Sequence, residues 1–384
     1  MPDVLFRNAT VYTPEEALPE AWVWVQEGRI AGVGTAEAPL RSGAQVVDLR
    51  GRLLAPGFID LHAHGAMGYD AMDATPEALR ALARFYAQHG VTAFLATTMT
   101  APAAAILAAL ETVACVQAEG TGGAALLGAH VEGPYLDVER RGCQDAALVR
   151  PAEPSEYRRL LATGVVRLLT VAPEYPENQV LIREATAQGI AVAAGHTRAS
   201  YDAMVRAVAL GVRQVTHLFN GMEPLHHRTP GAVGAALALD ALRCQVIADN
   251  VHLHPAVLTL AARAKGPDGI ILVTDAMAGA GMPDGEYTLG GITITVRDGI
   301  ARDPEGALAG STLTMERAVA NMDAAAGLGR AAALTMATRT PARALGLGAH
   351  KGRIARGYDA DLVVLEKDLT VVLTMVAGEV VYRG

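Results

Sequence analysis

Short apolar segments alternate with longer alanine- and leucine-rich segments through the middle of the chain. The apolar segments have the length of strands and lie at 58–64, 91–99, 124–132, 165–172, 190–196, 212–218, 244–249 and 269–275. Helix-like segments lie between most of them, at 76–89, 102–118, 177–188 and 255–264, with a weaker one at 231–241. Such alternation favours a parallel sheet covered by helices, and eight units of this kind predict a (β/α)8 TIM-like barrel. A doubly wound open sheet is the alternative, but no G-x-G-x-x-G motif follows an early strand.

Both ends of the chain are rich in β-forming residues. Strand-like runs lie at 4–6, 10–12, 21–25, 361–365, 371–376 and 380–382, with turn residues between several of them. Because chain termini often lie close together, residues 1–56 and 346–384 are predicted to form one small β-sandwich domain. Residues 57–345 then form the barrel, with a β-hairpin inserted after its eighth strand at about 284–308.

Composition narrows the class of protein. The 384 residues are 51% hydrophobic and 19% charged, which is typical of an ordered globular protein with a large core. The formal net charge of −8 argues against nucleic acid or an anionic membrane as partner. The cytoplasm is the expected compartment. The three cysteines form no C-x-x-C pattern, and the first residues do not resemble a secretion signal. No apolar run reaches transmembrane length.

Polar side chains with metal-binding chemistry gather at the ends of the predicted strands. Because the carboxyl ends of barrel strands form one face, these side chains are expected to meet there. Six of the eleven histidines and two carboxylates occupy such positions: His62, His64, His130, His196, His217, His252, Glu132 and Asp275. Structural histidines scattered at random would not cluster in this way.

Glu132, His196 and His217 are the strongest candidate ligands. Each ends an apolar strand, where a buried carboxylate or imidazole is costly without a cation. Two histidines and one glutamate form a common catalytic zinc set, which also suits Fe²⁺ or Co²⁺. His62 and His64 are two apart on a strand and therefore share a face, so they hold a second metal ion or contact the ligands and substrate. His130 shares the face of Glu132 and is expected to support the ligands.

Asp275 ends the eighth predicted strand, where an aspartate can be a ligand, a helix cap or a base. A metal ion that lowers the pKa of water gives this carboxylate a useful role as a proton shuttle. It would accept a proton from the attacking water and deliver it to a departing nitrogen, which otherwise leaves poorly.

Several segments together resemble the amidohydrolase superfamily and, within it, the N-acetylglucosamine-6-phosphate deacetylases. They follow one another in order over nearly the whole chain, at 56–64, 130–136, 194–197, 216–222, 228–231, 247–252, 273–276, 308–312 and 352–362. The resemblance implies a homodimer that hydrolyses the acetamide of N-acetyl-D-glucosamine 6-phosphate to D-glucosamine 6-phosphate and acetate. Such an activity serves amino-sugar catabolism and cell-wall recycling. It also implies one or two divalent ions held by the ligands named above, with Asp275 as the acid and base.

The substrate contacts are implied by the same resemblance. They are Cys143, Gln144, Asn220, Gly221, Arg228, His252, Leu308, Ala309 and Gly310. His252 and Arg228 would bind the 6-phosphate, with Arg228 supplied by the partner subunit. The chain departs from some members at Gln144, where they have histidine. It keeps His62, where other members have glutamine and use one metal, so a second metal remains open.

Two other interpretations are considered. Another metal-dependent amidohydrolase would act on a different N-acetyl hexosamine phosphate or on a cyclic amide. Enzymes of the cyclic-amide kind often bridge two metals with a carboxylated lysine, but Lys265, Lys351 and Lys367 do not end strands. A non-catalytic scaffold would be expected to lack some of the ligands, and all are present here.

Overall fold

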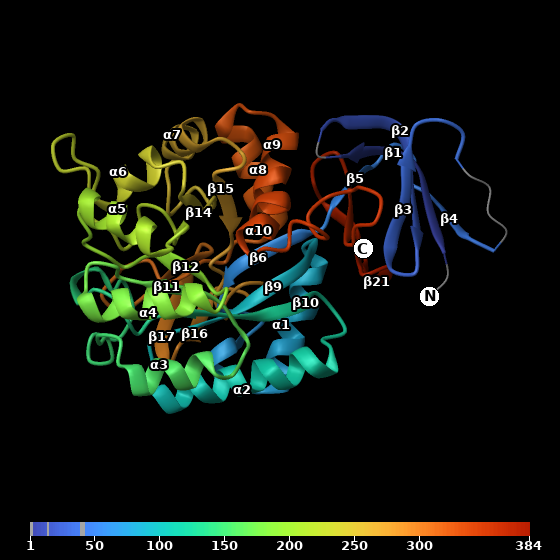
Figure 1. Cartoon of the computed structure of the whole chain (residues 1–384). Coiled ribbons are helices and arrows are strands. Elements are labelled where there is room, and N and C mark those ends of the chain that lie inside the picture. Colours follow the sequence, from blue (N-terminus) through green and yellow to red (C-terminus); the bar gives the residue numbers. More distant parts are fainter. Residues whose placement is uncertain (1–2, 14, 39–42) are drawn as a thin grey trace.

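A barrel of parallel strands occupies the centre of the computed structural model, which describes residues 3–13, 15–38 and 43–384. Eight strands within these residues follow one another around it in chain order (Figure 1). They are β6 (Phe58–Ala63), β9 (Val91–Thr98), β10 (Ala125–Glu132), β11 (Val166–Val171), β12 (Ala191–Ala194), β13 (Gln214–Val215), β14 (Arg243–Ile247) and β15 (Ile270–Val273). Most are buried on both faces, as expected for parallel strands covered by helices.

The barrel closes where β15 returns to β6. The backbone N–H of Asp275 donates to the carbonyl of His62 over 2.8 Å, and the N–H of His64 donates to that of Ala276 over 2.8 Å. The closure lies just beyond the carboxyl ends of the two strands, so it brings three predicted site residues together. The predicted (β/α)8 barrel is confirmed.

Helices cover the outside of the barrel (Figure 1). They are α1 (Pro76–Gln88), α2 (Ala103–Glu119), α3 (Pro154–Leu161), α4 (Pro176–Ala187), α5 (Tyr201–Leu210), α6 (Gly231–Ala238), α7 (Pro255–Lys265), α8 (Met315–Ala326), α9 (Arg330–Ala337) and α10 (Arg339–Ala344). The residues at the N-termini of several of these helices explain where each helix begins. Thr75, for example, caps α1 by accepting from the N–H of Ala78, and Pro76 occupies the first helical position. All five predicted helices are present.

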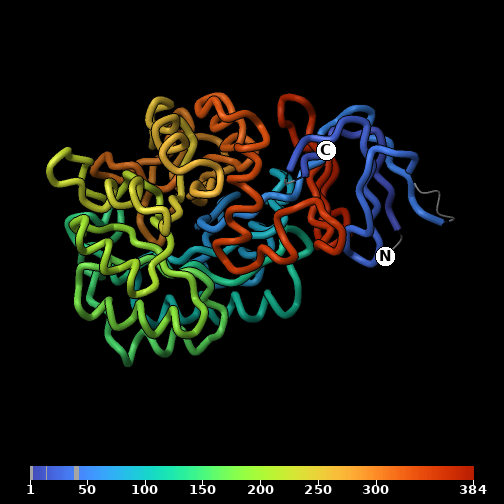
Figure 2. The backbone as a smooth tube through the Cα atoms, turned by 45° about the horizontal axis from the view of Figure 1, so that its top comes forward, coloured from blue at the N-terminus to red at the C-terminus, as the bar shows by residue number. Residues whose placement is uncertain are grey.

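The two ends of the chain form one sheet beside the barrel, as Figures 1 and 2 show by the contact of blue and red strands. Its order is β21-β20-β19-β5-β1-β2-β3, with β4 paired to β1. The strands are β1 (Val4–Tyr12), β2 (Ala17–Gln26), β3 (Arg29–Gly34), β4 (Gln45–Asp48), β5 (Leu53–Pro56), β19 (Leu362–Leu365), β20 (Val371–Val376) and β21 (Glu379–Arg383). Its own apolar cluster includes Phe6, Leu54 and Leu362. Residues 1–2, 14 and 39–42 of the predicted β domain lie outside the described residues.

A small antiparallel sheet follows the barrel's last strand. The predicted hairpin is present as β16 (Gly285–Leu289) and β17 (Ile292–Arg297), and β18 (Ile300–Arg302) extends it. Ile294 and Val296 pack against Met99 and Met277 at the carboxyl end of the barrel. Shorter elements at this end are β7 (Gly65–Ala66), β8 (Tyr69–Asp70), and the 3-10 turns η1 (Ala71–Asp73) and η2 (Val138–Arg140). No helix in the described part of the chain has the length and apolar character needed to cross a membrane.

Candidate functional site

The predicted site residues converge on a pocket of about 280 Å³ at the carboxyl ends of the barrel strands. Those that line it are His64, Glu132, Cys143, Gln144, His196, His217, Asn220, Gly221, His252, Asp275, Leu308 and Gly310. Sequence reasoning missed Met99, Gly142 and Leu289, which also line it. Leu289 comes from the inserted sheet, and no sequence signal indicated that this sheet would reach the pocket.

Glu132, His196 and His217 form the first group. Glu132 Oε1 lies 3.2 Å from His196 Nε2 and 3.1 Å from His217 Nε2, and the two imidazole nitrogens lie 3.0 Å apart. All three side chains are buried, and together they could hold a metal ion.

Hydrogen bonding at the far side of each ring shows why this group suits a cation. His196 Nδ1 donates to the carbonyl of Arg140 over 2.7 Å, and His217 Nδ1 donates to that of Asn220 over 3.1 Å. A carbonyl only accepts, so the ring proton lies on Nδ1 and the lone pair of the neutral ring lies on Nε2. Two Nε2 lone pairs and a carboxylate oxygen then face one another without a proton to share, which a metal ion satisfies.

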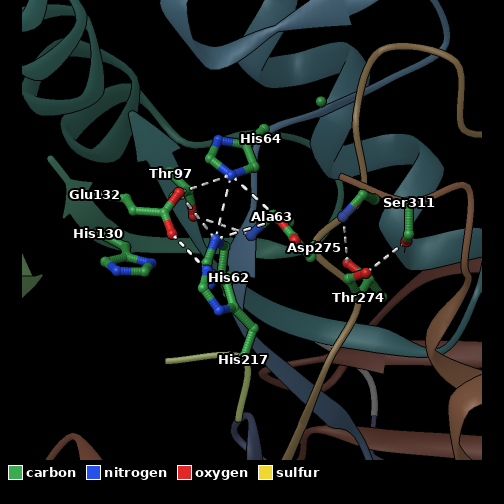
Figure 3. Close-up of polar contacts among 12 residues, drawn as sticks. His62, Ala63, His64, Thr97, His130, Glu132, His217, Thr274, Asp275 and Ser311 are labelled. Atoms are coloured by element: carbon green, nitrogen blue, oxygen red, sulfur yellow. Dashed lines mark hydrogen bonds and ion pairs between the residues drawn. The ribbon is translucent and has the colours of Figure 1, made fainter. Parts of the chain in front are cut away.

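His62 and His64 form a second group around the other oxygen of Glu132 (Figure 3). Glu132 Oε2 lies 3.4 Å from His62 Nε2 and 3.3 Å from His64 Nε2, and these nitrogens lie 3.2 Å apart. Asp275 Oδ1 faces the same nitrogens at 3.3 and 3.2 Å. His62 belongs to β6 and His64 follows directly after it, and their Nε2 atoms point at the same place.

The second group is less firmly oriented than the first. His62 Nδ1 lies 3.3 Å from Gln245 Oε1, a side-chain partner rather than a backbone carbonyl. His64 Nδ1 is buried and has no hydrogen-bond partner among the residues that the structure describes. Since a fixed ring proton strengthens a histidine ligand, the first group should bind a metal ion more tightly.

Both carboxylates at the site are ionised. Burial raises the pKa of Glu132, but the charge of His62 and the neighbouring rings of His196 and His217 outweigh it and hold the pKa well below its usual range. Burial also raises the pKa of Asp275, and His62 and His64 bring it down to about 2. An ionised Asp275 is ready to accept a proton.

Three site residues have left-handed backbone conformations that non-glycine residues rarely adopt. The φ angles are 47° at His196, 27° at His217 and 51° at Asp275. A strand cannot continue through such angles, which explains why β13 (Gln214–Val215) ends before His217 although the predicted strand extended to residue 218. Strained residues of this kind concentrate at functional sites, where the turn directs side chains into the pocket.

Two buried polar residues lie beneath the ligands. Asp60 accepts from the hydroxyl of Thr274 over 2.6 Å and from the N–H of His62 over 3.2 Å, so it connects β6 to β15. Sequence reasoning missed Asp60, although it lies two residues before His62 and therefore on the same strand face. His130 bonds to Thr170 over 2.7 Å, and its ring lies 4.6 Å from that of His62.

The residues expected to contact the acetamide also lie at the pocket. Gln144 accepts from the backbone N–H of Thr100 over 2.7 Å, which directs its NH₂ group toward Glu132 Oε2 at 3.3 Å. Burial, followed by the charges of Asp275 and Glu132, raises the pKa of Cys143 to about 12. Cys143 therefore remains a neutral thiol and contributes no thiolate nucleophile.

The expected phosphate ligands lie apart in this single chain. His252 lines the pocket, whereas Arg228 is exposed and borders a separate groove of about 800 Å³. The guanidinium of Arg228 contacts His227 Nε2 at 2.8 Å. Ala309 is fully buried under the inserted sheet, between the pocket residues Leu308 and Gly310.

Comparisons with known proteins agree with this geometry. Residues 53–381 match the amidohydrolase family. An N-acetylglucosamine-6-phosphate deacetylase from Lysinibacillus sphaericus is 37% identical over 98% of this chain and 97% of the relative. An N-acetylgalactosamine-6-phosphate deacetylase from Escherichia coli O157:H7 is 38% identical over 94% of this chain and 96% of the relative.

Solved structures lead to the same family. The structure of a mutant N-acetyl-D-glucosamine-6-phosphate deacetylase from Mycobacterium smegmatis, in complex with N-acetyl-D-glucosamine-6-phosphate, has a TM-score of 0.93 and 35% identity. The match covers 99% of this chain and 100% of that one. The chain therefore belongs to the amidohydrolase family and, within it, to the N-acetylglucosamine-6-phosphate deacetylases.

Proposed function

We propose that the protein hydrolyses the acetamide of N-acetyl-D-glucosamine 6-phosphate to D-glucosamine 6-phosphate and acetate. The observation that carries this proposal is the convergence of Glu132, His196 and His217, with lone pairs directed at one point, beside the ionised Asp275. That set of groups suits hydrolysis of an amide, and relatives with this activity match nearly the whole chain.

A divalent ion held by Glu132, His196 and His217 is part of the proposal, with Zn²⁺, Fe²⁺ or Co²⁺ suited to these ligands. When bound, the ion would polarise the acetamide carbonyl and make water more acidic. His62 and His64, with Glu132 Oε2, would hold a second and weaker ion. Glu132 would belong to both ligand sets, since it lies within 3.4 Å of His62, His64, His196 and His217.

Asp275 is proposed as the general base and then the general acid. It would accept a proton from the attacking water as the new C–O bond forms at the acetyl carbon. It would then give that proton to the nitrogen as the C–N bond breaks, so that a neutral amine and acetic acid leave. The acid then loses its remaining proton to the solvent and becomes acetate. Its carboxylate contacts His64 at 3.2 Å and His62 at 3.3 Å, and these contacts orient it toward the ligand groups.

The substrate would occupy the pocket with its acetamide at the metal ligands. Asn220, Gly221, Cys143 and Gln144 would contact the sugar and acetamide, together with the segment of Leu308, Ala309 and Gly310. The 6-phosphate would bind His252 and the partner's Arg228 in a homodimer. The position of Arg228 in its own chain, exposed and outside the pocket, supports this arrangement.

We further propose that the chain divides into a β domain of residues 1–56 and 346–384 and a catalytic barrel of 57–345. The pairing of β19 with β5, directly before β6, supports this division. The cytoplasm is the proposed compartment, because Cys115, Cys143 and Cys244 are all free and a reducing environment suits free thiols.

Metal analysis of the purified protein, together with an acetate-release assay, tests the function. Loaded protein should release acetate from N-acetylglucosamine 6-phosphate, and removal of the metal by a chelator should abolish the release until metal is restored. A protein that holds metal but releases no acetate would contradict the proposal. The N-acetylgalactosamine-6-phosphate deacetylase among the relatives makes that epimer the second candidate substrate, to be assayed in parallel.

A further inference from the structure

Asp249 and His252 form a pair just beyond the carboxyl end of β14. Asp249 Oδ2 accepts from His252 Nδ1 over 2.6 Å, and the two side chains are only 12% and 6% exposed. Asp249 Oδ1 accepts from the backbone N–H groups of Val251, over 2.9 Å, and His252, over 2.8 Å. One carboxylate therefore fixes both the turn and the ring.

The pairing determines what His252 can present to the pocket. A carboxylate only accepts hydrogen bonds, so Nδ1 carries a proton and Nε2 is the remaining polar atom of the ring. With one ring proton, Nε2 would offer a lone pair, which repels an anion. With two ring protons, Nε2 becomes a donor on a positively charged ring, and the carboxylate at Nδ1 stabilises that charge.

The rest of the pocket lining in this chain offers few groups that could carry a positive charge toward a phosphate. Among its described lining residues there is no lysine or arginine. A phosphate monoester carries close to two negative charges at neutral pH, so positively charged donors bind it most strongly. Within one chain, His252 is the lining residue outside the two ligand groups that can take a positive charge.

We propose that Asp249 is a positioning residue for the substrate phosphate: it holds the His252 ring and stabilises its charged form, so that Nε2 donates to a phosphate oxygen. This inference rests on the proposed function, because it takes the phosphorylated sugar as the substrate. Asp249 acts through His252 and does not touch the reacting acetamide.

Asp249→Asn tests the inference with little change in shape. The amide oxygen can still accept from the two backbone N–H groups, but its NH₂ would face Nδ1, which must then be an acceptor. The ring could hold only one proton and would lose its charge. For the metal-loaded enzyme, KM for N-acetylglucosamine 6-phosphate should rise about tenfold with kcat nearly unchanged, the ratio expected for replacing a charge-assisted hydrogen bond with a neutral one. The effect should be confined to the phosphorylated substrate, with no such change for N-acetylglucosamine.

Binding of inorganic phosphate, measured by titration calorimetry on the metal-loaded protein, provides a readout that needs no turnover. Asp249→Asn should weaken it about tenfold, His252→Gln should weaken it similarly, and the double variant should be no weaker, because both changes remove the same charge. Additive losses, or unchanged phosphate affinity, would overturn the inference. If Asp249→Asn does not fold, Asp249→Ser carries the same expectation, since its hydroxyl can accept from the same turn. Wild-type protein that binds phosphate through this pair but releases no acetate would instead contradict the proposed function alone.

Discussion

Glu132 Oε2 lies 3.3 Å from His64 Nε2, while the other oxygen of the same carboxylate lies toward His196 and His217. One side chain therefore joins two groups of possible ligands that come from different sides of the barrel. The first group has both ring protons fixed by backbone carbonyls, and the second does not. This difference predicts unequal metal affinities.

His64→Asn should remove the weaker metal position and leave the stronger one. We expect the fully loaded wild-type protein to hold two equivalents of zinc and the variant one, as measured by elemental analysis after dialysis. His226→Asn is a matched control, because His226 is exposed in a loop outside the pocket, and it should not alter the stoichiometry. A wild-type protein that holds a single equivalent under saturating zinc would contradict the prediction.

Asp275→Asn should lower kcat by a factor of about 10²–10⁴, the contribution typical of general acid–base catalysis. Asparagine matches the shape of the aspartate but cannot carry a proton between water and nitrogen. Since Glu132, His196 and His217 are untouched, the variant should still hold metal at the first group. Steady-state kinetics test the loss of kcat, and elemental analysis of the same preparation tests whether the metal is retained. Undiminished turnover would refute the role of Asp275.

Thr274→Val should destabilise the fold by about 1–3 kcal/mol, because it removes a hydroxyl donor from the buried Asp60 carboxylate where the barrel closes. Chemical denaturation measures the free energy of unfolding. Thr92→Val is the control: this buried hydroxyl donates over 3.3 Å to the neutral carbonyl of Phe58. Its loss should cost about 0.5–1.5 kcal/mol, and equal effects at both positions would argue against a special role for Asp60.

Lys351→Met should destabilise the protein by about 3 kcal/mol at neutral pH, because it leaves the buried Asp361 without its cation. Lys351 Nζ lies 2.6 Å from Asp361 and 3.1 Å from Asp359. Lys367→Met, at an exposed lysine, is the control and should change stability little.

The same ion pairs predict a pH dependence. Burial lowers the pKa of Lys351, but Asp361 and Asp359 outweigh it, so the folded-state pKa lies above the ordinary value of 10.5. A raised lysine pKa contributes stability that is fully present below 10.5 and is lost as the pH rises through the folded-state pKa. The stability difference between wild type and Lys351→Met should therefore be constant from pH 7 to 9 and shrink above about 10.5. Thermal melts across this range measure it, and a difference that grows at high pH would contradict the assignment.

Much of the site could be predicted because its signals are local. His62 and His64 share a face through the two-residue period of a strand, and Glu132, His196, His217 and Asp275 each follow an apolar strand. The position of Asp60 at the site could have been predicted in the same way, because it lies two residues before His62 on the same strand. The Asp249–His252 pair could not be predicted, because it depends on a turn whose side-chain hydrogen bonds leave no distinctive pattern in the sequence.

The sequence by itself determined the barrel, the sheet built from both chain ends and the identity of the candidate ligands, because apolar periodicity and strand-end positions are properties of neighbouring residues. Only the tertiary structure decided that Glu132 divides its oxygens between two histidine pairs, and that carbonyls of Arg140 and Asn220 orient one of them. It also decided that Arg228 lies outside its own chain's pocket. These relations depend on distances and angles between segments far apart in the chain, and they arise only when the barrel closes and its loops pack over one end.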